Sequence, residues 1–152
     1  MRIRFLNARI EVDGIDITDE IRGTEISELS SKVSAIKAVR EELFHIQRSF
    51  AEAGKTILEG RDTGTVIFPE AGNKFFLDAS IEERGRRRFA EQKDKAVDIE
   101  DTIEAMMQRD ERDSKRAIAP LRPADDAVYI DTTGLGIEDV ISRILRVLGR
   151  DP

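Results

Sequence analysis

The chain has 152 residues, of which 39% are hydrophobic and 37% charged, so it has the size and composition of one well-solvated globular domain. It contains no cysteine, which excludes disulfides and thiolate metal sites, and its single histidine, His45, excludes most zinc sites and histidine-dependent triads. No apolar run approaches the ~20 residues that cross a bilayer, and the net charge of −6 argues against a nucleic-acid-binding surface. We therefore expect a cytoplasmic protein that has neither a membrane nor a nucleic acid as its partner.

The first 21 residues read as a small β-structure. Alternating apolar residues over 2–12 predict a hairpin, Asp13-Gly14 predicts a turn, and residues 15–18 predict a short third strand. Residues 19–21 then fit one helical turn with Thr18 as its cap.

The stretch from Ile26 to Ala53 places apolar residues every three or four positions, which predicts one amphipathic helix or two helices broken near Ser34. Ser31 and Arg40 lie on its polar side, nine residues apart. Because nine residues make two and a half turns, both side chains reach one site only if the helix breaks between them.

Gly54-Lys55-Thr56 imitates the end of a phosphate-binding P-loop. The pattern GxxxxGK[ST] needs a glycine at position 49, where this chain has Ser49, and it needs a strand before the loop and a helix after it. Here a predicted helix comes before the segment and a predicted strand comes after it. We therefore interpret the segment as the exit of a helix.

The segment GRDTGTVIFP at 60–69 carries the most chemistry in the chain. Ile57 and Leu58 predict a short buried strand before it, which places Arg61 and Asp62 at a strand's carboxyl end, where α/β sheets gather their ligands. A guanidinium beside a carboxylate offers an anion fork and an acceptor pair, and Gly64 lets the loop turn tightly. Taken alone, the Arg61–Asp62 pair fits a loop salt bridge better than a ligand site, and only the rest of the chain favours the second interpretation.

Further strand and helix signals complete the pattern of a doubly wound α/β sheet. Residues 74–78 and 127–131 predict short strands, the first of the kind that a parallel sheet covers on both faces. Ser80 and Glu83 predict a capping box for a helix that ends near residue 92. Helices over about 98–113 and over 137–148 follow, and the low apolar content of 84–98 suggests a solvated lid.

Seven arginines gather in two groups, one in each of the two middle helices: Arg84, Arg86, Arg87 and Arg88, then Arg109, Arg112 and Arg116. Arg109, Asp113 and Arg116 are spaced i, i+4 and i+7 and so share one helix face. By spacing alone we favour a solvated salt-bridge ladder, worth ~0.3–0.5 kcal/mol per pair. A phosphate-and-sugar site would require the same mixed face, so the periodicity does not decide between them. Because the chain offers no activated nucleophile, the arginines and Asp62 favour anion binding and phosphoryl transfer.

Four segments closely resemble the bacterial cytidylate kinase family. They are VDGIDITDEIRG at 12–23, SSKVSAIKAVREEL at 30–43, ILEGRDTGTVIFPEAGNKFFLDASIEERGRRR at 57–88 and QRDERDSKRAIAPL at 108–121. The resemblance implies a nucleoside monophosphate kinase fold and transfer of the ATP γ-phosphoryl group to CMP or dCMP, with Mg²⁺ accompanying ATP. It assigns no metal ligand to this chain.

The same resemblance implies roles for ten residues, with Asp62 accepting from the exocyclic amine of the base. The implied roles are cytosine recognition for Ser31, Arg40 and Asp62, phosphate binding for Arg61 and Arg116, ribose binding for Arg109 and Asp113, and closure over the transferring phosphoryl group for the lid residues Arg84, Arg87 and Arg88.

Compared with the family, the sequence begins after the Gly-rich P-loop and after a DSGxxYR motif. In the family the P-loop strand is the central strand, between the strands expected here at 56–60 and 74–78. We therefore expect a P-loop-type α/β sheet that misses its first strands, with residues 1–31 as a substrate-side β insert. Residues 32–152 would form the core, with a lid at about 84–115.

The resemblance does not determine which partner completes the sheet or whether this chain is active. A complementary P-loop fragment would complete the sheet and give an active kinase, whereas unpaired strand edges would favour self-association. The alternatives are a non-catalytic CMP-binding module and an inert fragment.

Overall fold

The computed structural model describes residues 2–6, 9–22, 24–49, 51, 54–91 and 98–150. The chain divides into two compact units, residues 1–43 and 44–152, and each is described by itself. The boundary expected after residue 31 stays a prediction. The centre of the expected hairpin at residues 7–8 and part of the expected lid, residues 92–97, lie outside the described residues.

The first unit opens with an antiparallel sheet of order β1-β2-β3. Its strands are β1 (Ile3–Leu6), β2 (Arg9–Val12) and β3 (Ile15–Asp16), and Ile3 lies opposite Val12. The turn between β2 and β3 needs left-handed backbone, which it takes at Asp13 with φ 50° and Gly14 with φ 87°. The predicted hairpin, turn and third strand are therefore confirmed.

Three helical segments follow this sheet. They are the 3₁₀ turn η1 (Glu20–Arg22), then α1 (Thr24–Val33) and α2 (Lys37–Ser49), which continues into the second unit. Of the two alternatives expected for this stretch, the structure has the two helices broken near Ser34, because α1 ends at Val33 and α2 begins at Lys37.

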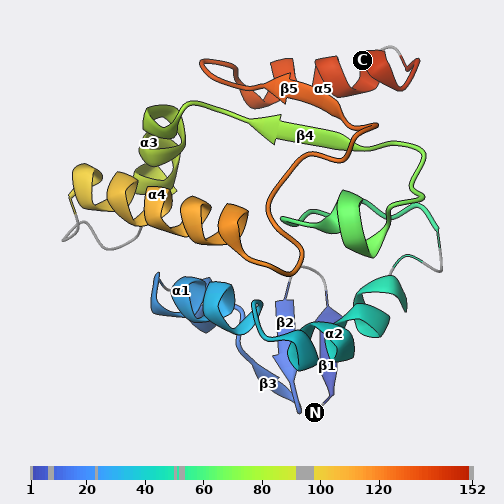
Figure 1. Ribbon diagram of the computed structural model, residues 1–152, viewed down its shortest axis with the longest axis vertical. Helices are drawn as coiled ribbons and strands as arrows, with labels where there is room; N and C mark the ends of the chain where they lie inside the picture. Colours follow the sequence, from blue (N-terminus) through green and yellow to red (C-terminus); the bar gives the residue numbers. More distant parts are fainter. Residues whose placement is uncertain are drawn as a thin grey trace. The chain divides into compact units, whose positions relative to one another are not determined.

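The second unit contains a parallel pair of strands, β4 (Phe75–Asp78) and β5 (Val128–Asp131). Helix α3 (Ile81–Glu91) follows the carboxyl end of β4, and α5 (Ile137–Val147) follows that of β5 (Figure 1). These elements confirm the strands and helices predicted for 74–92 and 127–148. They also supply the strand-then-helix units of an α/β fold.

The short buried strand predicted at Ile57 and Leu58 is wrong. Residues 55–60 are neither helix nor strand, and Ile57 is 99% exposed. A strand forms only where a neighbouring strand pairs its N–H and C=O groups, and within the described residues none lies beside this segment. The expected cover on both faces of 74–78 is also wrong, since Leu77 of β4 and Tyr129 of β5 are at least half exposed.

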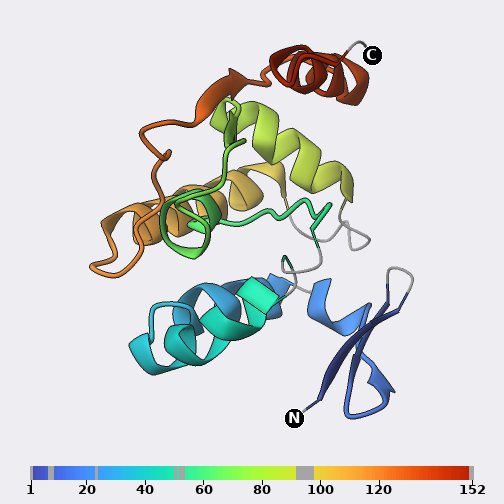
Figure 2. The same ribbon diagram turned by 90° about the vertical axis from the view of Figure 1, so that its right-hand side faces the viewer.

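Helices α3 and α4 (Ile99–Lys115) pack side by side (Figure 2). The contact centres on the buried Gly85, where an added Cβ would lie 2.3 Å from Cγ1 of Ile103. Helix α4 begins at Asp98, whose carboxylate accepts a hydrogen bond from the N–H of Glu100. No helix within the described residues has both the length and the apolar character to span a bilayer.

Only half of the predicted capping box at the start of α3 is present. The hydroxyl of Ser80 accepts from the N–H of Glu83 at 3.2 Å, as expected. The N–H of Ser80 donates instead to the Thr133 hydroxyl at 2.9 Å, and the Glu83 carboxylate pairs with Arg86 and Arg87. Two nearby guanidinium groups thus bind the carboxylate that the capping box would have used.

Candidate functional site

Arg61 and Asp62 precede η2 (Thr63–Ile67), a single π-type turn. The carbonyl of Asp62 accepts from the N–H groups of residues 65, 66 and 67 at 3.2, 2.9 and 3.3 Å. The side chain of Asp62 does not cap the turn, and Ile67 at its far end is buried. The backbone beside Arg61 is therefore fixed by local hydrogen bonds and one apolar anchor.

Gly64 serves this loop through its small size. Its φ is not positive, and an added Cβ would lie 3.2 Å from Cδ of Lys74. Lys74 passes close to the loop, donates to the carbonyl of Pro69 at 2.5 Å and pairs with Asp126 at 2.7 Å. The tight turn expected at Gly64 is present as η2, and the missing side chain also allows the close approach of Lys74.

Arg48, at the end of α2, holds the other end of the loop. Its Nη1 donates to the carbonyl of Ile67 at 2.6 Å and its Nη2 to Oε1 of Glu70 at 2.5 Å. The guanidinium also lies 5.1 Å from the ring centroid of Phe68 and 5.6 Å from that of Phe44, which are cation–π distances. The hydrogen bond from Arg48 lowers the pKa of the Glu70 carboxyl below its ordinary value.

Asp113 of α4 is the buried centre of the site, with 3% of its side chain exposed. Its Oδ2 lies 3.7 Å from Nε of Arg61 and 3.7 Å from Nε of Arg109. Its Oδ1 lies 3.8 Å from Nη1 of Arg116. Arg109 and Asp113 share one face of α4 as predicted, whereas Arg116 is the residue just after the helix and has extended backbone. Because the Asp113 carboxylate is buried, this group differs from a solvated ladder.

Asp110, one turn before Asp113, extends this network toward α3. Its Oδ2 accepts from Nη1 of Arg84, and its Oδ1 lies 3.8 Å from Nη2 of Arg61. Residues from α3, from α4 and from the segment before η2 therefore meet at two carboxylates. We call the six residues of this network the arginine cluster: Arg61, Arg84, Arg109, Asp110, Asp113 and Arg116.

Within the arginine cluster, four guanidinium groups lie close to one another around two carboxylates. Burial lowers the pKa of Arg109 from its ordinary value, and the positive charge of Arg61 lowers it further. Asp113 and Asp110 act in the opposite direction. A bound anion would relieve this repulsion, so the cluster suits an anionic ligand.

The other two lid arginines have different surroundings. Arg87 is held by Glu83 and by the start of the β5–α5 loop, where it donates to the hydroxyl and the carbonyl of Thr132 at 3.1 and 2.7 Å. Arg88 lies 3.9 Å from Glu91, and its charge contributes to lowering the pKa of Arg109. Arg88 therefore lies within electrostatic range of the arginine cluster, whereas Arg87 ties α3 to the end of β5.

Ser31 and Arg40 belong to the first unit. Ser31 is buried, and its carbonyl accepts from the hydroxyl of Ser34 at 2.9 Å. Arg40 Nη1 donates to the carbonyl of the same Ser34 at 3.2 Å. Both residues therefore contact Ser34, the first residue after α1.

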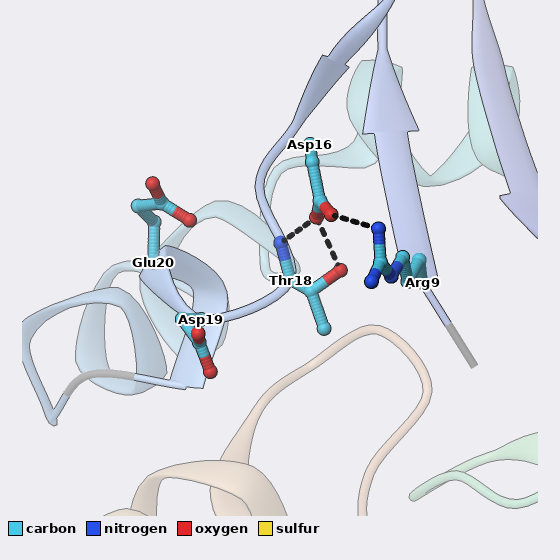
Figure 3. Close-up of a pocket in the computed structure, with 5 residues that line it drawn as sticks. All are labelled: Arg9, Asp16, Thr18, Asp19 and Glu20. Carbon is cyan, nitrogen blue, oxygen red and sulfur yellow. Dashed lines mark hydrogen bonds and ion pairs between the residues drawn. The ribbon is translucent and has the colours of Figure 1, made fainter.

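A shallow hollow in the first unit is lined by Arg9, Asp16, Thr18, Asp19 and Glu20 (Figure 3). Asp16 Oδ1 accepts from the N–H of Thr18 at 3.0 Å and from its hydroxyl at 2.5 Å, and Oδ2 lies 3.8 Å from Arg9. The hydroxyl bond from Thr18 lowers the pKa of Asp16. These bonds brace the link from β3 to η1, and we assign the hollow no ligand.

With this geometry described, comparison with known proteins identifies the family. A statistical model of the family described as "Cytidylate kinase" matches residues 1–150. The chain is 56% identical to a cytidylate kinase of Geobacter sulfurreducens over 90% of its length. The chain belongs to the cytidylate kinase family. It is also 47% identical to cytidylate kinases of Pseudomonas aeruginosa strain LESB58 and Syntrophotalea carbinolica, over 91% and 97% of its length.

The chain spans only part of these cytidylate kinases. It covers 59% of the Geobacter sulfurreducens protein, 61% of the Pseudomonas aeruginosa protein and 66% of the Syntrophotalea carbinolica protein. The family has the P-loop fold of nucleoside monophosphate kinases, and the parallel pair β4–β5 with its following helices fits that fold.

Sequence reasoning missed two residues that the structure places in this region, Asp110 in the arginine cluster and Arg48 beside the 60–70 loop. A signal for Asp110 was present, because it precedes Asp113 by three residues and therefore shares its helix face. No local signal marks Arg48, since its partners lie 19 and 22 residues further along the chain.

Proposed function

We propose that this chain supplies the acceptor side and the lid of a cytidylate kinase, which transfers the γ-phosphoryl group of ATP to CMP or dCMP and yields CDP or dCDP. It would work in pyrimidine nucleotide metabolism in the cytoplasm. The observation that carries the proposal is the arginine cluster, in which four guanidinium groups surround two carboxylates. A nucleoside monophosphate brings a phosphate charge of about −1.5 to −2 at pH 7, which clustered guanidinium groups are suited to bind.

The phosphate and the ribose would both bind around Asp113. Arg61 and Arg116 would hold the phosphate, because a planar guanidinium donates two parallel hydrogen bonds to phosphate oxygens. Arg109 and Asp113 would hold the ribose, with the carboxylate accepting from sugar hydroxyls. Asp113 would also keep the three surrounding guanidinium groups in place before the nucleotide arrives.

Cytosine would be read by Asp62 together with Ser31 and Arg40. A carboxylate accepts from the exocyclic amine of cytosine, whereas uracil presents a carbonyl oxygen there, which would repel it. The guanidinium of Arg40 would donate to the ring acceptors of the base. In support, Ser31 and Arg40 both lie beside Ser34, on either side of the α1–α2 break.

The lid arginines Arg84, Arg87 and Arg88 would neutralise charge on the transferring phosphoryl group. Phosphoryl transfer depends mostly on positioning and on electrostatic stabilisation of the equatorial oxygens. Arg84 is held against the acceptor side through Asp110, and Arg88 lies near Arg109. We assign Arg87 to the lid as well, anchored through Thr132.

The donor side of the kinase would lie in the part of the relatives' length that this chain does not span. Among the described residues no group of three His, Cys, Asp or Glu side chains is placed to hold a metal ion, so we assign none to Mg²⁺. The sequence contains no GxxxxGK[ST] pattern, whose backbone amides would cradle the ATP phosphates. We propose that a segment with this loop inserts a strand beside β4 and residues 56–60, or that self-association fills that place. Either would cover Ile57, which is exposed.

Calorimetry on the full chain tests the acceptor site. The proposal predicts that CMP binds at least tenfold more tightly than AMP and that Arg61→Ala removes this binding. Arg122→Ala, which changes an exposed arginine outside the cluster, is the matched control and should leave CMP affinity unchanged. Equal affinity for CMP and AMP, or CMP binding that Arg61→Ala does not alter, would contradict the proposal.

A transfer assay tests the donor side separately. ATP, Mg²⁺ and CMP are incubated with the chain, with and without a polypeptide that carries a P-loop strand and loop. CDP formed only with the added polypeptide supports a divided kinase. CMP binding without CDP in either case would make the chain a non-catalytic CMP-binding module.

A further inference from the structure

Asp110 contacts arginines from two separate elements, one through each carboxylate oxygen. Its Oδ2 accepts from Nη1 of Arg84 in α3, and its Oδ1 lies 3.8 Å from Nη2 of Arg61, beside η2. Asp113, the other carboxylate of the cluster, also pairs with Arg61, and it pairs in addition with Arg109 and Arg116. Asp110 thus lies between the lid helix and the segment that carries Arg61.

Arg84 is itself held in a definite orientation. Its Nε donates to the carbonyl of Ala79 at 3.0 Å, at the end of β4, while its Nη1 binds Asp110. The guanidinium of Arg84 therefore connects the carboxyl end of β4 to α4, and one of its nitrogens binds Asp110. Because α3 and α4 pack directly against each other through Gly85, the Arg84–Asp110 contact is part of that helix pair.

We propose that Asp110 is a positioning residue that couples the lid arginine Arg84 to the phosphate-binding arginine Arg61. This inference rests on the proposed function of Arg61. When Arg84 occupies Oδ2, part of the Asp110 charge is neutralised, and Arg61 is drawn less strongly away from a phosphate. When Arg84 is removed, the full charge of Asp110 acts on Arg61 and competes with the phosphate.

This coupling predicts a specific dependence between two sites. Arg84→Ala should weaken CMP binding although Arg84 is not assigned to the CMP phosphate, and the effect should require the charge of Asp110. Groups in one ion-pair network commonly couple, and we expect Arg84→Ala to weaken CMP binding about three- to tenfold, which is about 0.7–1.4 kcal/mol.

The test is a double-mutant cycle in the full chain, read by calorimetry with CMP. Arg84→Ala should weaken binding about three- to tenfold in the wild type and less than about twofold in the Asp110→Asn background. Arg84→Lys, which keeps a cation for Asp110, should restore most of the affinity. Glu111→Gln is the matched control background, because Glu111 lies next to Asp110 on α4 but pairs with the exposed Lys115. In that background Arg84→Ala should weaken binding as strongly as in the wild type.

An equal effect of Arg84→Ala in the wild type and in Asp110→Asn would overturn the coupling. A wild type that binds no CMP would instead refute the function proposed for the acceptor site. In that case the Nε–Hε NMR signal of Arg61 without ligand decides the coupling. The signal should move on Arg84→Ala in the wild type and stay in place in Asp110→Asn, and a signal that moves equally in both would overturn the inference.

Discussion

Replacing Asp113 by asparagine keeps the shape of the side chain and removes the charge that faces three guanidinium groups. Asp113 is 3% exposed, and its carboxylate lies 3.7–3.8 Å from Arg61, Arg109 and Arg116. Removing one partner of a buried ion pair costs about 3–5 kcal/mol, because the remaining charge stays buried and unbalanced. Arg61 is 42% exposed and can regain water, whereas Arg116 is 9% exposed and cannot. We therefore expect the lower end of that range, about 3 kcal/mol.

Urea unfolding and thermal melting of the full chain measure this loss. For a chain of this size, 1 kcal/mol corresponds to about 2–4 °C, so the melting temperature should fall by roughly 6–12 °C. Asp125→Asn is the matched control, since Asp125 is 100% exposed and lies 3.9 Å from Arg122. Its effect should stay within about 0.5 kcal/mol. If Asp113→Asn destabilised the protein no more than Asp125→Asn, the assignment of Asp113 as the buried centre of the cluster would be refuted.

Two further substitutions test the structure that holds the site. Gly85→Ala should lower the free energy of unfolding in urea by about 1–2 kcal/mol, because the steric cost of a Cβ 2.3 Å from Ile103 exceeds the gain in helix propensity. The control Gly72→Ala, which has open space around it, should change that free energy by less than about 0.5 kcal/mol. Equal effects of the two substitutions would contradict the close α3–α4 packing. Glu70 has a pKa lowered mainly by the hydrogen bond from Arg48, so its contribution is present above its ordinary value of 4.5 and is lost as pH falls through the lowered pKa. Glu70→Gln should therefore flatten the loss of melting temperature below pH 4.5, and an unchanged acid limb would contradict the pairing.

The sequence correctly predicted those helices, strands and turns that are determined by residues close together in the chain. The break at Ser34, the hairpin and turn around Gly14, and the strands at 74–78 and 127–131 follow from spacing, turn residues and short apolar runs. The shared face of Arg109 and Asp113 follows from helix geometry alone.

What sequence reasoning missed depends on distant segments. The strand expected at Ile57 needs a pairing partner, which an apolar dipeptide does not specify. The pairing of Asp110 with Arg84 depends on how α3 and α4 pack, and spacing within either helix does not reveal it. The burial of Asp113 distinguishes the arginine cluster from a row of solvent-exposed ion pairs along a helix. That burial likewise depends on how the second unit packs, which the spacing of residues in one helix does not reveal.

Arginine Nε–Hε NMR signals recorded during a CMP titration test the central claim most directly, that the arginine cluster binds the nucleotide. The account predicts that the signals of Arg61, Arg109 and Arg116 shift together with one dissociation constant, while those of Arg122 and Arg146 stay in place. Signals of the three cluster arginines that do not respond to CMP, or that move no more than those of Arg122 and Arg146, would contradict it.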